Sequence, residues 1–311
     1  MPSPSALACP ASLKNVLSNV DAARALCDGF AEAGVDATAL PVADGGDGTI
    51  AALCTEVGHF DVDDAFGRPR SALVGRRDDA LVVESAQVLP LDPRRRDASH
   101  ASSRGLGELI ARLSAPRLVI GLGGTATMDG GEGLLEVLDA LPAPTTVLCD
   151  VQTTYLDAPR IFGPQKGAST PAAIAELEAR FRANLRVAPF AALPGSGAAG
   201  GLGGALASLG ATLVPGAATI LDLLGFDARG HALVVTGEGR VDATTAAGKA
   251  PGEVARRAVA AHTPCVVFGG VVAGALPGVE TVSLSGRPAA AAGDLLELGR
   301  ALGTRLLDAP G

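Results

Sequence analysis

The sequence contains no tryptophan, one tyrosine and eight phenylalanines among its 311 residues. Proteins that bind single-stranded nucleic acid stack bases on exposed aromatic rings, so this scarcity argues against that class. A net charge of -8 at pH 7 likewise argues against a surface for nucleic acid or for an anionic membrane. We therefore expect a small-molecule partner and a core of aliphatic side chains.

Cysteine is also sparse: the five residues are widely spaced and never form a Cys-x-x-Cys pair. This pattern fits neither a disulfide framework nor a zinc site. The sequence shows no basic start followed by a long apolar run, and no stretch near the roughly 18 apolar residues of a membrane span. These absences predict a globular protein of the reducing cytoplasm with no membrane partner.

Hydrophobic residues make up 48% of the chain, enough to bury two cores. Strand and helix patterns alternate at both ends of the chain, which predicts one parallel α/β sheet built from residues 1–60 and 230–311. Between the ends, short extended runs at 60–66, 70–75 and 80–85 are separated by turn signals that suit an antiparallel meander. We predict that residues 61–229 form a second, mixed α/β domain inserted into the first.

The segment VVTGEGRVDATTAAGK, residues 234–249, places Glu238, Arg240, Asp242 and Lys249 behind a short apolar strand. It is not a P-loop, because that pattern needs glycine where Ala243 stands. The glycines can offer N–H groups to phosphate, the two bases add positive charge, and Asp242 is available for Mg²⁺ or a proton. Ligands gather at the carboxyl ends of strands in open α/β sheets, which favours a site over a solvated turn.

The segment GLGGTA, residues 121–126, has the dinucleotide-binding spacing, but the glycines at 130, 131 and 133 would break the helix that should follow. A dinucleotide oxidoreductase is therefore disfavoured. Thr125, Thr127 and Asp129 form a polar loop that either faces a substrate or only connects a strand to a helix.

Further acidic and basic candidates follow or lie between the predicted elements. Asp44 and Asp47 lie between a strand at 38–42 and a helix at 50–57, either solvated or placed as metal or hydroxyl partners of an anion at the helix N-terminus. Asp150 ends an apolar strand and is either functional or a turn cap. We expect FGPQKG, residues 162–167, to be a loop in which Lys166 supplies a donor, with a structural turn as the alternative.

Hydrolase chemistry has little support, because the four histidines share no spacing and the chain shows no nucleophile elbow. Six segments taken in order, LPVADGGDGT, VIGLGGTATMDGGEG, LCDV, FGPQKGA, PGSGAAGGLG and VTGEGRVDATTAAGK, resemble the bacterial glycerate kinase family (type I glycerate kinases). The resemblance runs from about residue 6 to residue 268. It implies a Rossmann- or flavodoxin-like domain carrying an inserted second domain. It also implies a phosphotransferase with an alcohol acceptor, which uses ATP and Mg²⁺ to phosphorylate a hydroxyl of D-glycerate, giving phosphoglycerate and ADP. A homo-oligomer is left open.

The sequence departs from the family pattern at three places, one of which is a much shorter segment between Leu141 and Thr146. The family's Ala-Pro-Asp-Ser-Phe-Lys-Gly appears as CPASLKN, so that Ala11 replaces the acid while Ser12 and Lys14 remain. The family's Cys-Asp-Val-x-Asn-Pro-Leu appears as CDVQTTYL, and residues 152–155 are expected to shape a different pocket wall. Two alternatives therefore stay open: a non-catalytic ligand-binding relative, and a kinase of another small hydroxy acid.

The resemblance also implies residue roles, since phosphoryl transfer depends on positioning and on compensation of charge. Carboxylate and phosphate contacts are expected from the bases Lys14, Lys166, Arg240 and Lys249. Mg²⁺ binding and acceptance of the hydroxyl proton are expected from Asp44, Asp47, Asp150 and Asp242. Asp150 and Asp242 are the preferred metal ligands, and the expected catalytic residues are Asp242, Lys249 and Lys14. The expected substrate- and nucleotide-binding residues are Ser12, Asp44, Asp47, Thr125, Thr127, Asp129, Lys166, Glu238 and Arg240.

Overall fold

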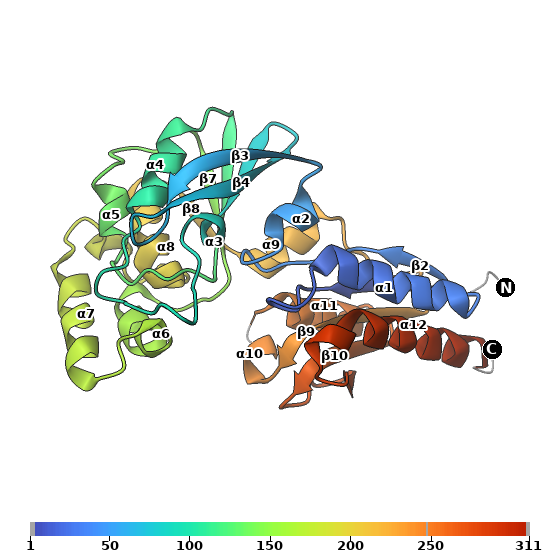
Figure 1. Ribbon diagram of the computed structural model, residues 1–311. Helices are drawn as coiled ribbons and strands as arrows, with labels where there is room; N and C mark the ends of the chain where they lie inside the picture. Colours follow the sequence, from blue (N-terminus) through green and yellow to red (C-terminus); the bar gives the residue numbers. More distant parts are fainter. Residues whose placement is uncertain (1–3, 247, 309–311) are drawn as a thin grey trace. The chain divides into compact units, whose positions relative to one another are not determined.

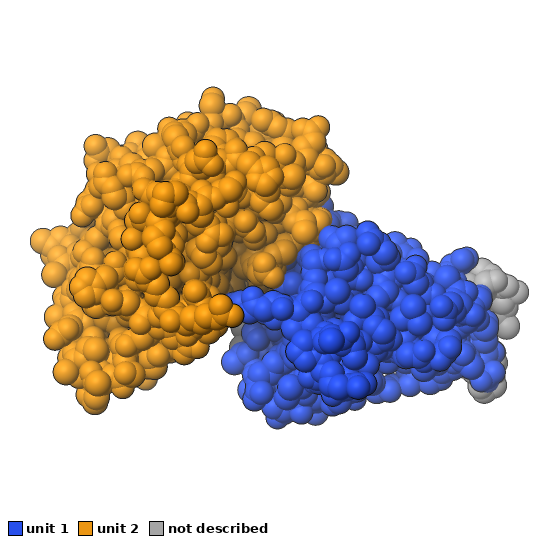
Figure 2. All heavy atoms as spheres, in the orientation of Figure 1, with its two compact units in different colours: residues 1–43, 220–311 blue, residues 44–219 orange. Residues whose placement is uncertain are grey.

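The computed structural model describes residues 4–246 and 248–308. The chain divides into two compact units, coloured separately in Figure 2: a first unit of residues 1–43 and 220–311, and a second unit of residues 44–219. No helix in the described ranges combines the length and the apolar character that a membrane crossing requires.

The first unit contains a five-stranded sheet in which every neighbouring pair is parallel. Its strand order is β11-β10-β9-β1-β2. The strands are β1 (Ser5–Pro10), β2 (Asp36–Ala39), β9 (Leu233–Val241), β10 (Cys265–Val272) and β11 (Glu280–Ser283). Counted within this sheet, the order is the 2-1-3-4-5 of flavodoxin-like folds, which confirms the predicted class. The order reverses between β1 and β9, so the ligand-binding switch point of such folds lies at their carboxyl ends.

Helices pack against this sheet through small residues. Helices α1 (Asn19–Glu32) and α12 (Ala291–Asp308) lie side by side (Figure 1). They approach so closely that a Cβ on Gly29 would lie 2.0 Å from the Leu296 carbonyl oxygen. Helix α11 (Ala250–Ala260) packs on β9 and β10, and α10 (Ala243–Ala246) precedes it.

The sequence pattern favours Asn19 as the N-cap of the first helix, and the structure contradicts this expectation. Ser18 caps α1, because its hydroxyl oxygen accepts the N–H of Asp21 at 3.0 Å. The side chain of Asn19 is buried instead and donates to the Val42 carbonyl oxygen at 3.1 Å. The Asn19 side chain therefore makes a tertiary contact to Val42 instead of capping the helix.

The second unit contains a six-stranded mixed sheet with the order β3-β4-β5-β6-β7-β8. The strands are β3 (Glu56–Asp63), β4 (Pro69–Arg77), β5 (Ala80–Glu84), β6 (Arg117–Leu122), β7 (Thr145–Cys149) and β8 (Thr212–Pro215). Strands β3 to β5 form the predicted antiparallel meander, and β5 to β8 are parallel. The mixed sheet of the inserted part is therefore confirmed.

The limits of the compact units differ from the expected domain limits at residues 60/61 and 229/230. Strand β3 begins at Glu56 and pairs with β4 along its whole length, so residues 56–60 belong to the sheet of the second unit. The second limit falls inside helix α9 (Gly216–Leu223) rather than in the loop after it.

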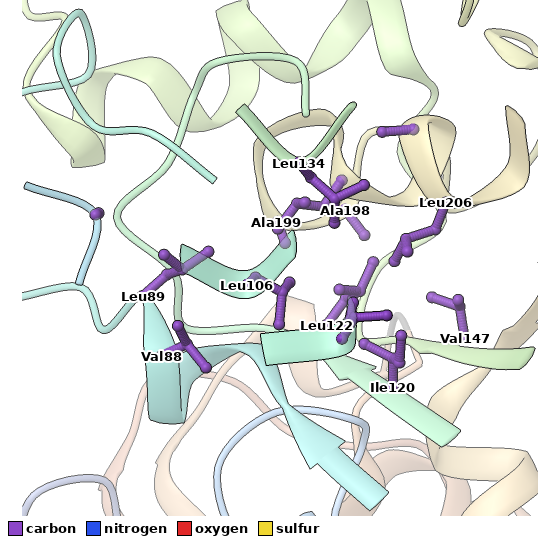
Figure 3. Close-up of a cluster of buried hydrophobic side chains, with 14 of the residues drawn as sticks. Val88, Leu89, Leu106, Ile120, Leu122, Leu134, Val147, Ala198, Ala199 and Leu206 are labelled. Carbon is purple, nitrogen blue, oxygen red and sulfur yellow. The ribbon is translucent and has the colours of Figure 1, made fainter. Parts of the chain in front are cut away.

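The remaining helices belong to the second unit. They are α2 (Thr49–Leu53), α3 (Ser85–Val88), α4 (Arg104–Arg112), α5 (Glu132–Leu135), α6 (Ala158–Lys166), α7 (Pro171–Ala183) and α8 (Ala198–Ser208). Figure 3 shows how aliphatic side chains from the sheet, including Ile120 and Leu122, pack under Leu106 and Leu206 of the covering helices. The core of this unit is aliphatic, as the scarcity of aromatic residues predicted, apart from the tilted ring pair of Tyr155 and Phe181.

Three local predictions were wrong. The helix expected at 50–57 ends at Leu53, because Glu56 starts strand β3. Residues 162–166 were expected in a loop but lie in helix α6, which accommodates Pro164 near its end. Residues 237–240 were expected to follow a short strand, yet they continue β9 by pairing with β10.

Candidate active site

The carboxyl ends of β1 and β9 bring together the first group of predicted residues, all in the first unit. The N–H of Ala11 donates to the Gly237 carbonyl oxygen at 2.9 Å, so the chain leaving β1 runs along β9. A Cβ on Gly239 would lie 3.8 Å from the backbone nitrogen of Lys14. The Ser12–Lys14 loop therefore crosses β9 at the switch point, with the Lys14 side chain exposed.

The carboxylate of Glu238 organises the segment after β9. It accepts the hydroxyl of buried Thr245 at 2.7 Å and the ammonium group of Lys249 at 3.1 Å. Lys249 is the residue before helix α11. The N-terminal end of a helix carries a partial positive charge. We interpret Glu238 as the residue that orients Lys249, a different task from the direct substrate contact that the sequence predicted.

Asp242 follows β9 directly and is ionised across the neutral range. Its Oδ1 accepts the hydroxyl and the N–H of Thr244, at 2.6 and 2.9 Å, and its Oδ2 accepts the Arg240 Nε at 3.1 Å. The Thr244 hydrogen bonds, with help from Arg240 and Lys249, lower the pKa of Asp242 to about 2. A carboxylate this acidic is a weak proton acceptor, so the geometry favours a charge-bearing role over that of the base.

The Asp44–Gly48 loop lies over the carboxyl ends of β6 and β7 in the second unit. A Cβ on Gly45 would lie 2.6 Å from the Leu148 carbonyl oxygen, and one on Gly123 would lie 2.9 Å from the Gly46 Cα. The Gly123 position would also be 2.8 Å from the Asp150 Oδ2. Asp150 and the Asp44 loop are therefore neighbours, and the glycines allow this close approach because they lack side chains.

Glu84 is a residue of this group that the sequence analysis missed. It ends β5, is 2% exposed, and accepts the N–H of Ile50 in α2 at 2.6 Å. Burial raises its pKa to about 7, with a further rise from Asp47, although the Ile50 N–H opposes both. The signal was present in ALVVE, where an acid ends an apolar strand as Asp150 does in TTVLCD.

Lys166 reaches the polar loop after β6. The residue is 5% exposed, and its ammonium group donates to the Thr127 carbonyl oxygen at 2.9 Å and to the Thr125 hydroxyl at 3.3 Å. The Thr127 hydroxyl in turn donates to the Ala199 carbonyl oxygen at 3.2 Å. The structure thus joins Thr125, Thr127 and Lys166 in one buried network.

The carboxylate of Asp129, by contrast, is bound by neighbouring residues of the protein. Its carboxylate accepts the N–H and the hydroxyl of Ser103, both at 2.7 Å, and the N–H groups of Gly131 and Gly133. Four donors on a side chain that is 1% exposed leave little capacity for a substrate. This geometry favours a role in joining α4 to α5 over the predicted substrate contact.

Tyr155 was expected to help shape a pocket wall, and this was wrong. The ring is 1% exposed and stacks on Phe181, and its hydroxyl donates to the Gly130 carbonyl oxygen at 2.9 Å. The N–H of Tyr155 donates to the Ser196 hydroxyl at 2.8 Å. The side chain faces the core because it fills the space left by the glycines at 130, 201 and 204.

The described residues contain no cluster of three or more His, Cys, Asp or Glu side chains arranged to hold a metal ion. The two preferred metal ligands belong to different units, Asp150 to the second and Asp242 to the first. Within the second unit, Asp44 Oδ1 and Asp150 Oδ2 both lie against the contact between Gly46 and Gly123.

All three lysines of the chain are among the predicted site residues. The chain uses arginine for every other basic side chain apart from histidine, and its lysines are Lys14, Lys166 and Lys249. An ammonium group differs from a guanidinium in being a compact point charge, which suits contact with a single phosphate oxygen. The three positions that the sequence predicted are thus chemically distinct from the surface bases.

Comparison with known proteins shows which family the chain resembles. A model of the glycerate kinase family matches residues 6–144 and 141–286. A glycerate 2-kinase of Escherichia coli K12 is 34% identical over 319 residues, covering 84% of each chain. A glycerate kinase of Bacillus subtilis 168 is 31% identical over 322 residues, covering 85% of this chain and 84% of the relative.

A solved structure is similar over nearly the full length. The crystal structure of a protein of Salmonella typhimurium LT2 assigned as glycerate kinase 2 has 29% sequence identity and a TM-score of 0.79, and the match covers 98% of both chains. These findings confirm the predicted family and the prediction of an ATP-dependent kinase. The chain belongs to the glycerate kinase family.

Proposed function

We propose that this protein transfers the γ-phosphoryl group of ATP to the 2-hydroxyl of D-glycerate, giving 2-phosphoglycerate and ADP. The family match along the chain supports glycerate as the acceptor. The name of the Escherichia coli relative, glycerate 2-kinase, supports the hydroxyl at carbon 2. The observation that carries the proposal is the restriction of lysine to Lys14, Lys166 and Lys249 within a chain that otherwise uses arginine.

Both reactants are anions, so the site needs cations placed for phosphate and carboxylate groups. Lys14 and Arg240 are exposed at the switch point of the first unit, where parallel sheets of this order bind ligands. Lys249 belongs to the same unit, where its ammonium group is held by Glu238. We assign Lys14, Arg240 and Lys249 to the oxygens of one reactant, with Asp242 fixing Arg240 through its 3.1 Å hydrogen bond.

In the reaction the glycerate hydroxyl oxygen forms a bond to the γ-phosphorus as the bond from that phosphorus to the bridging oxygen of ADP breaks. The hydroxyl proton leaves to a carboxylate or to water. Such a transfer passes through a loose transition state, so positioning and charge compensation contribute more than strong base catalysis. The low pKa of Asp242 is compatible with this chemistry, because the residue acts as a fixed negative charge that orients Arg240.

The second unit has a donor set that fits Mg²⁺. This ion prefers oxygen ligands and is held by one or two carboxylates together with water and substrate phosphates. Asp44 and Asp150 present carboxylate oxygens on either side of the paired glycines at 46 and 123. We propose that these two residues hold Mg²⁺, which when bound would neutralise charge on the phosphates.

The proposed reaction is tested with purified protein, ATP, MgCl₂ and D-glycerate, by coupling ADP release to an optical signal. The product is identified by ³¹P NMR without proton decoupling. A phosphate on carbon 2 couples to one proton and gives a doublet, whereas one on carbon 3 couples to two and gives a triplet.

We expect a product whose ³¹P signal is a doublet, formed in the same molar amount as ADP. Binding of glycerate without ADP release would favour the non-catalytic alternative that the replacement of the first acid by Ala11 suggested. Turnover with a different hydroxy acid in a screen, and none with D-glycerate, would reject glycerate as the substrate.

A further inference from the structure

Glu84, the last residue of β5, and Ser85, the first of α3, contact the segments around both glycine-rich loops of the second unit. Glu84 accepts the Ile50 N–H at 2.6 Å, immediately after the Asp44–Gly48 loop. The hydroxyl oxygen of Ser85 accepts the Gly123 N–H at 3.5 Å, in the loop after β6. The end of β5 therefore contacts the backbone next to the two loops that carry Asp44, Asp47 and Thr125.

Helix α2 has no cap from its own sequence. The residue before it is Gly48, which has no side chain and adopts a φ of 89°. The Thr49 hydroxyl turns back to the Gly46 carbonyl oxygen at 2.7 Å. Because the first N–H groups of a helix lack partners within it, an acceptor from elsewhere is needed, and the Glu84 carboxylate supplies it.

The loop before α2 packs closely on the neighbouring strands. Gly45 has a φ of 102° and fits between β6 and β7 only because it lacks a Cβ, which would lie 2.6 Å from the Leu148 carbonyl oxygen. The Asp44 Oδ1 accepts the Gly46 N–H at 3.2 Å, a contact inside the loop itself. Exposed Asp47 lies three residues before Ile50, so the first turn of α2 directly continues the backbone that carries it.

We propose that Glu84 is a positioning residue for phosphoryl transfer: its carboxylate fixes the first turn of α2 and so the Asp44–Gly48 loop, without touching the reactants. The side chain is 2% exposed and is covered by its own contacts to Ile50 and Gln87. This inference rests on the proposed kinase function for its catalytic consequence. Its structural half, the anchoring of the loop, stands on the contacts alone.

The acceptor role separates two substitutions. In Glu84→Gln the amide oxygen can still accept the Ile50 N–H, whereas Glu84→Ala removes the acceptor. We expect Glu84→Ala to lower kcat, by up to about 100-fold if the loop moves on the scale of an ångström. We expect Glu84→Gln to restore most of it, and KM for ATP and glycerate to change much less than kcat in both.

The experiment combines these kinetics with hydrogen exchange of residues 44–53 in the full chain. The Ile50 amide should exchange at least about tenfold faster in Glu84→Ala and at nearly the wild-type rate in Glu84→Gln. Leu109→Ala serves as the control for general loss of stability, because Leu109 lies in the core of the same unit and is fully buried. It should leave kcat per folded molecule unchanged.

Wild-type exchange and kcat in Glu84→Ala would overturn the inference. So would a Glu84→Gln variant with normal exchange but a kcat as low as that of Glu84→Ala, since that result requires the negative charge itself. If the wild-type protein makes no phosphoglycerate, the proposed function fails, and the exchange measurement still decides whether Glu84 holds the loop.

Discussion

The ammonium group of Lys249 lies 3.1 Å from the carboxylate of Glu238, an ion pair between the end of a sheet and the start of a helix. The same carboxylate accepts the hydroxyl of buried Thr245 at 2.7 Å, which fixes its orientation. A lysine held in this way loses little further side-chain freedom when it binds an anion. The pair therefore links the strand β9 to the proposed chemistry.

Removing Glu238 should impair both catalysis and stability. Glu238→Ala should lower kcat/KM by about tenfold or more, because Lys249 loses its orienting partner. The free energy of unfolding should fall by about 1 kcal/mol or less from the lost ion pair, since the Lys249 side chain is partly exposed. The lost acceptor of the buried Thr245 hydroxyl should cost about 1–3 kcal/mol more. Steady-state kinetics and thermal unfolding measure the two effects.

Glu253→Ala is the matched control for that variant. Its side chain is 13% exposed, against 14% for Glu238, and it also carries ion pairs in the first unit, to Arg256 and Arg257. It should leave kcat/KM near the wild-type value. Equal kinetic losses in the two variants would contradict the special role of Glu238.

Lysine-directed acylation should report the site directly, because the chain has only three lysine side chains. An amine-reactive ester should modify exposed Lys14 and then half-exposed Lys249, and should inactivate the enzyme. Lys166 should resist, since it is 5% exposed and donates to Thr127 and Thr125. Mass spectrometry of peptides, with and without ATP and D-glycerate, measures modification and protection; modification of Lys14 and Lys249 with full activity retained would remove both from the proposed site.

Asp242→Asn should lower kcat/KM by about 100-fold, the scale of a misplaced catalytic group. The pKa of Asp242 is about 2, so the residue is already ionised wherever the folded protein is assayed. The variant should therefore reduce activity equally at each pH from about 5 to 9 without moving the limbs of the pH profile. Loss of the acidic limb in Asp242→Asn would instead identify the residue as the base.

Tyr155→Phe should destabilise the fold and spare catalysis. The change leaves the buried Gly130 carbonyl oxygen without the Tyr155 hydroxyl donor, which costs about 1–3 kcal/mol. Chemical denaturation measures this loss, and kcat and KM should stay at wild-type values. A changed KM for glycerate with unchanged stability would restore the idea that Tyr155 shapes the pocket.

Alkaline pH should weaken the fold through its buried thiols. All five cysteines are free, and burial raises the pKa of Cys265 from 9.0 to about 12. Because the unfolded chain releases this proton first, stability falls as pH rises above 9 and levels off only near the folded pKa. At pH 10 the loss is about 1.4 kcal/mol for this thiol.

Unfolding curves between pH 8 and 10 measure the slope, and Cys265→Ala is the matched variant. The substitution should remove the contribution of this thiol to the pH dependence of the free energy of unfolding. It should also lower that free energy by a pH-independent amount, because the buried sulfur is missing. An unchanged slope in Cys265→Ala would show that the thiol ionises equally well in the folded state.

Much of the architecture was predictable from local pattern. Alternating strands and helices at the two ends of the chain, and turn signals between residues 60 and 85, suffice to predict a parallel sheet and an antiparallel meander, because hydrophobic period and turn chemistry act over a few residues. The same local logic placed Asp150 at a strand end. It also predicted the aliphatic core from the lack of aromatic residues.

Other features depended on contacts between distant segments. Pairing of β9 with β10 keeps Gly237 to Arg240 in a strand, although two glycines suggested a loop. Asn19 is drawn from the cap of α1 to the Val42 carbonyl oxygen, and Tyr155 is drawn into the core by glycines far along the chain. Sequence pattern could not predict these choices, because the deciding partner lies elsewhere.

The sequence by itself determined which chemical groups are present: three lysines, a set of strand-end carboxylates, and glycines where backbones must meet. Only the tertiary structure decided what each group does. It engages all sides of Asp129 with four donors, sets Glu238 on Lys249, and brings Glu84 to the N–H of Ile50. The physical reason is that hydrogen bonds act over about 3 Å, and only the fold brings residues distant in sequence within that range.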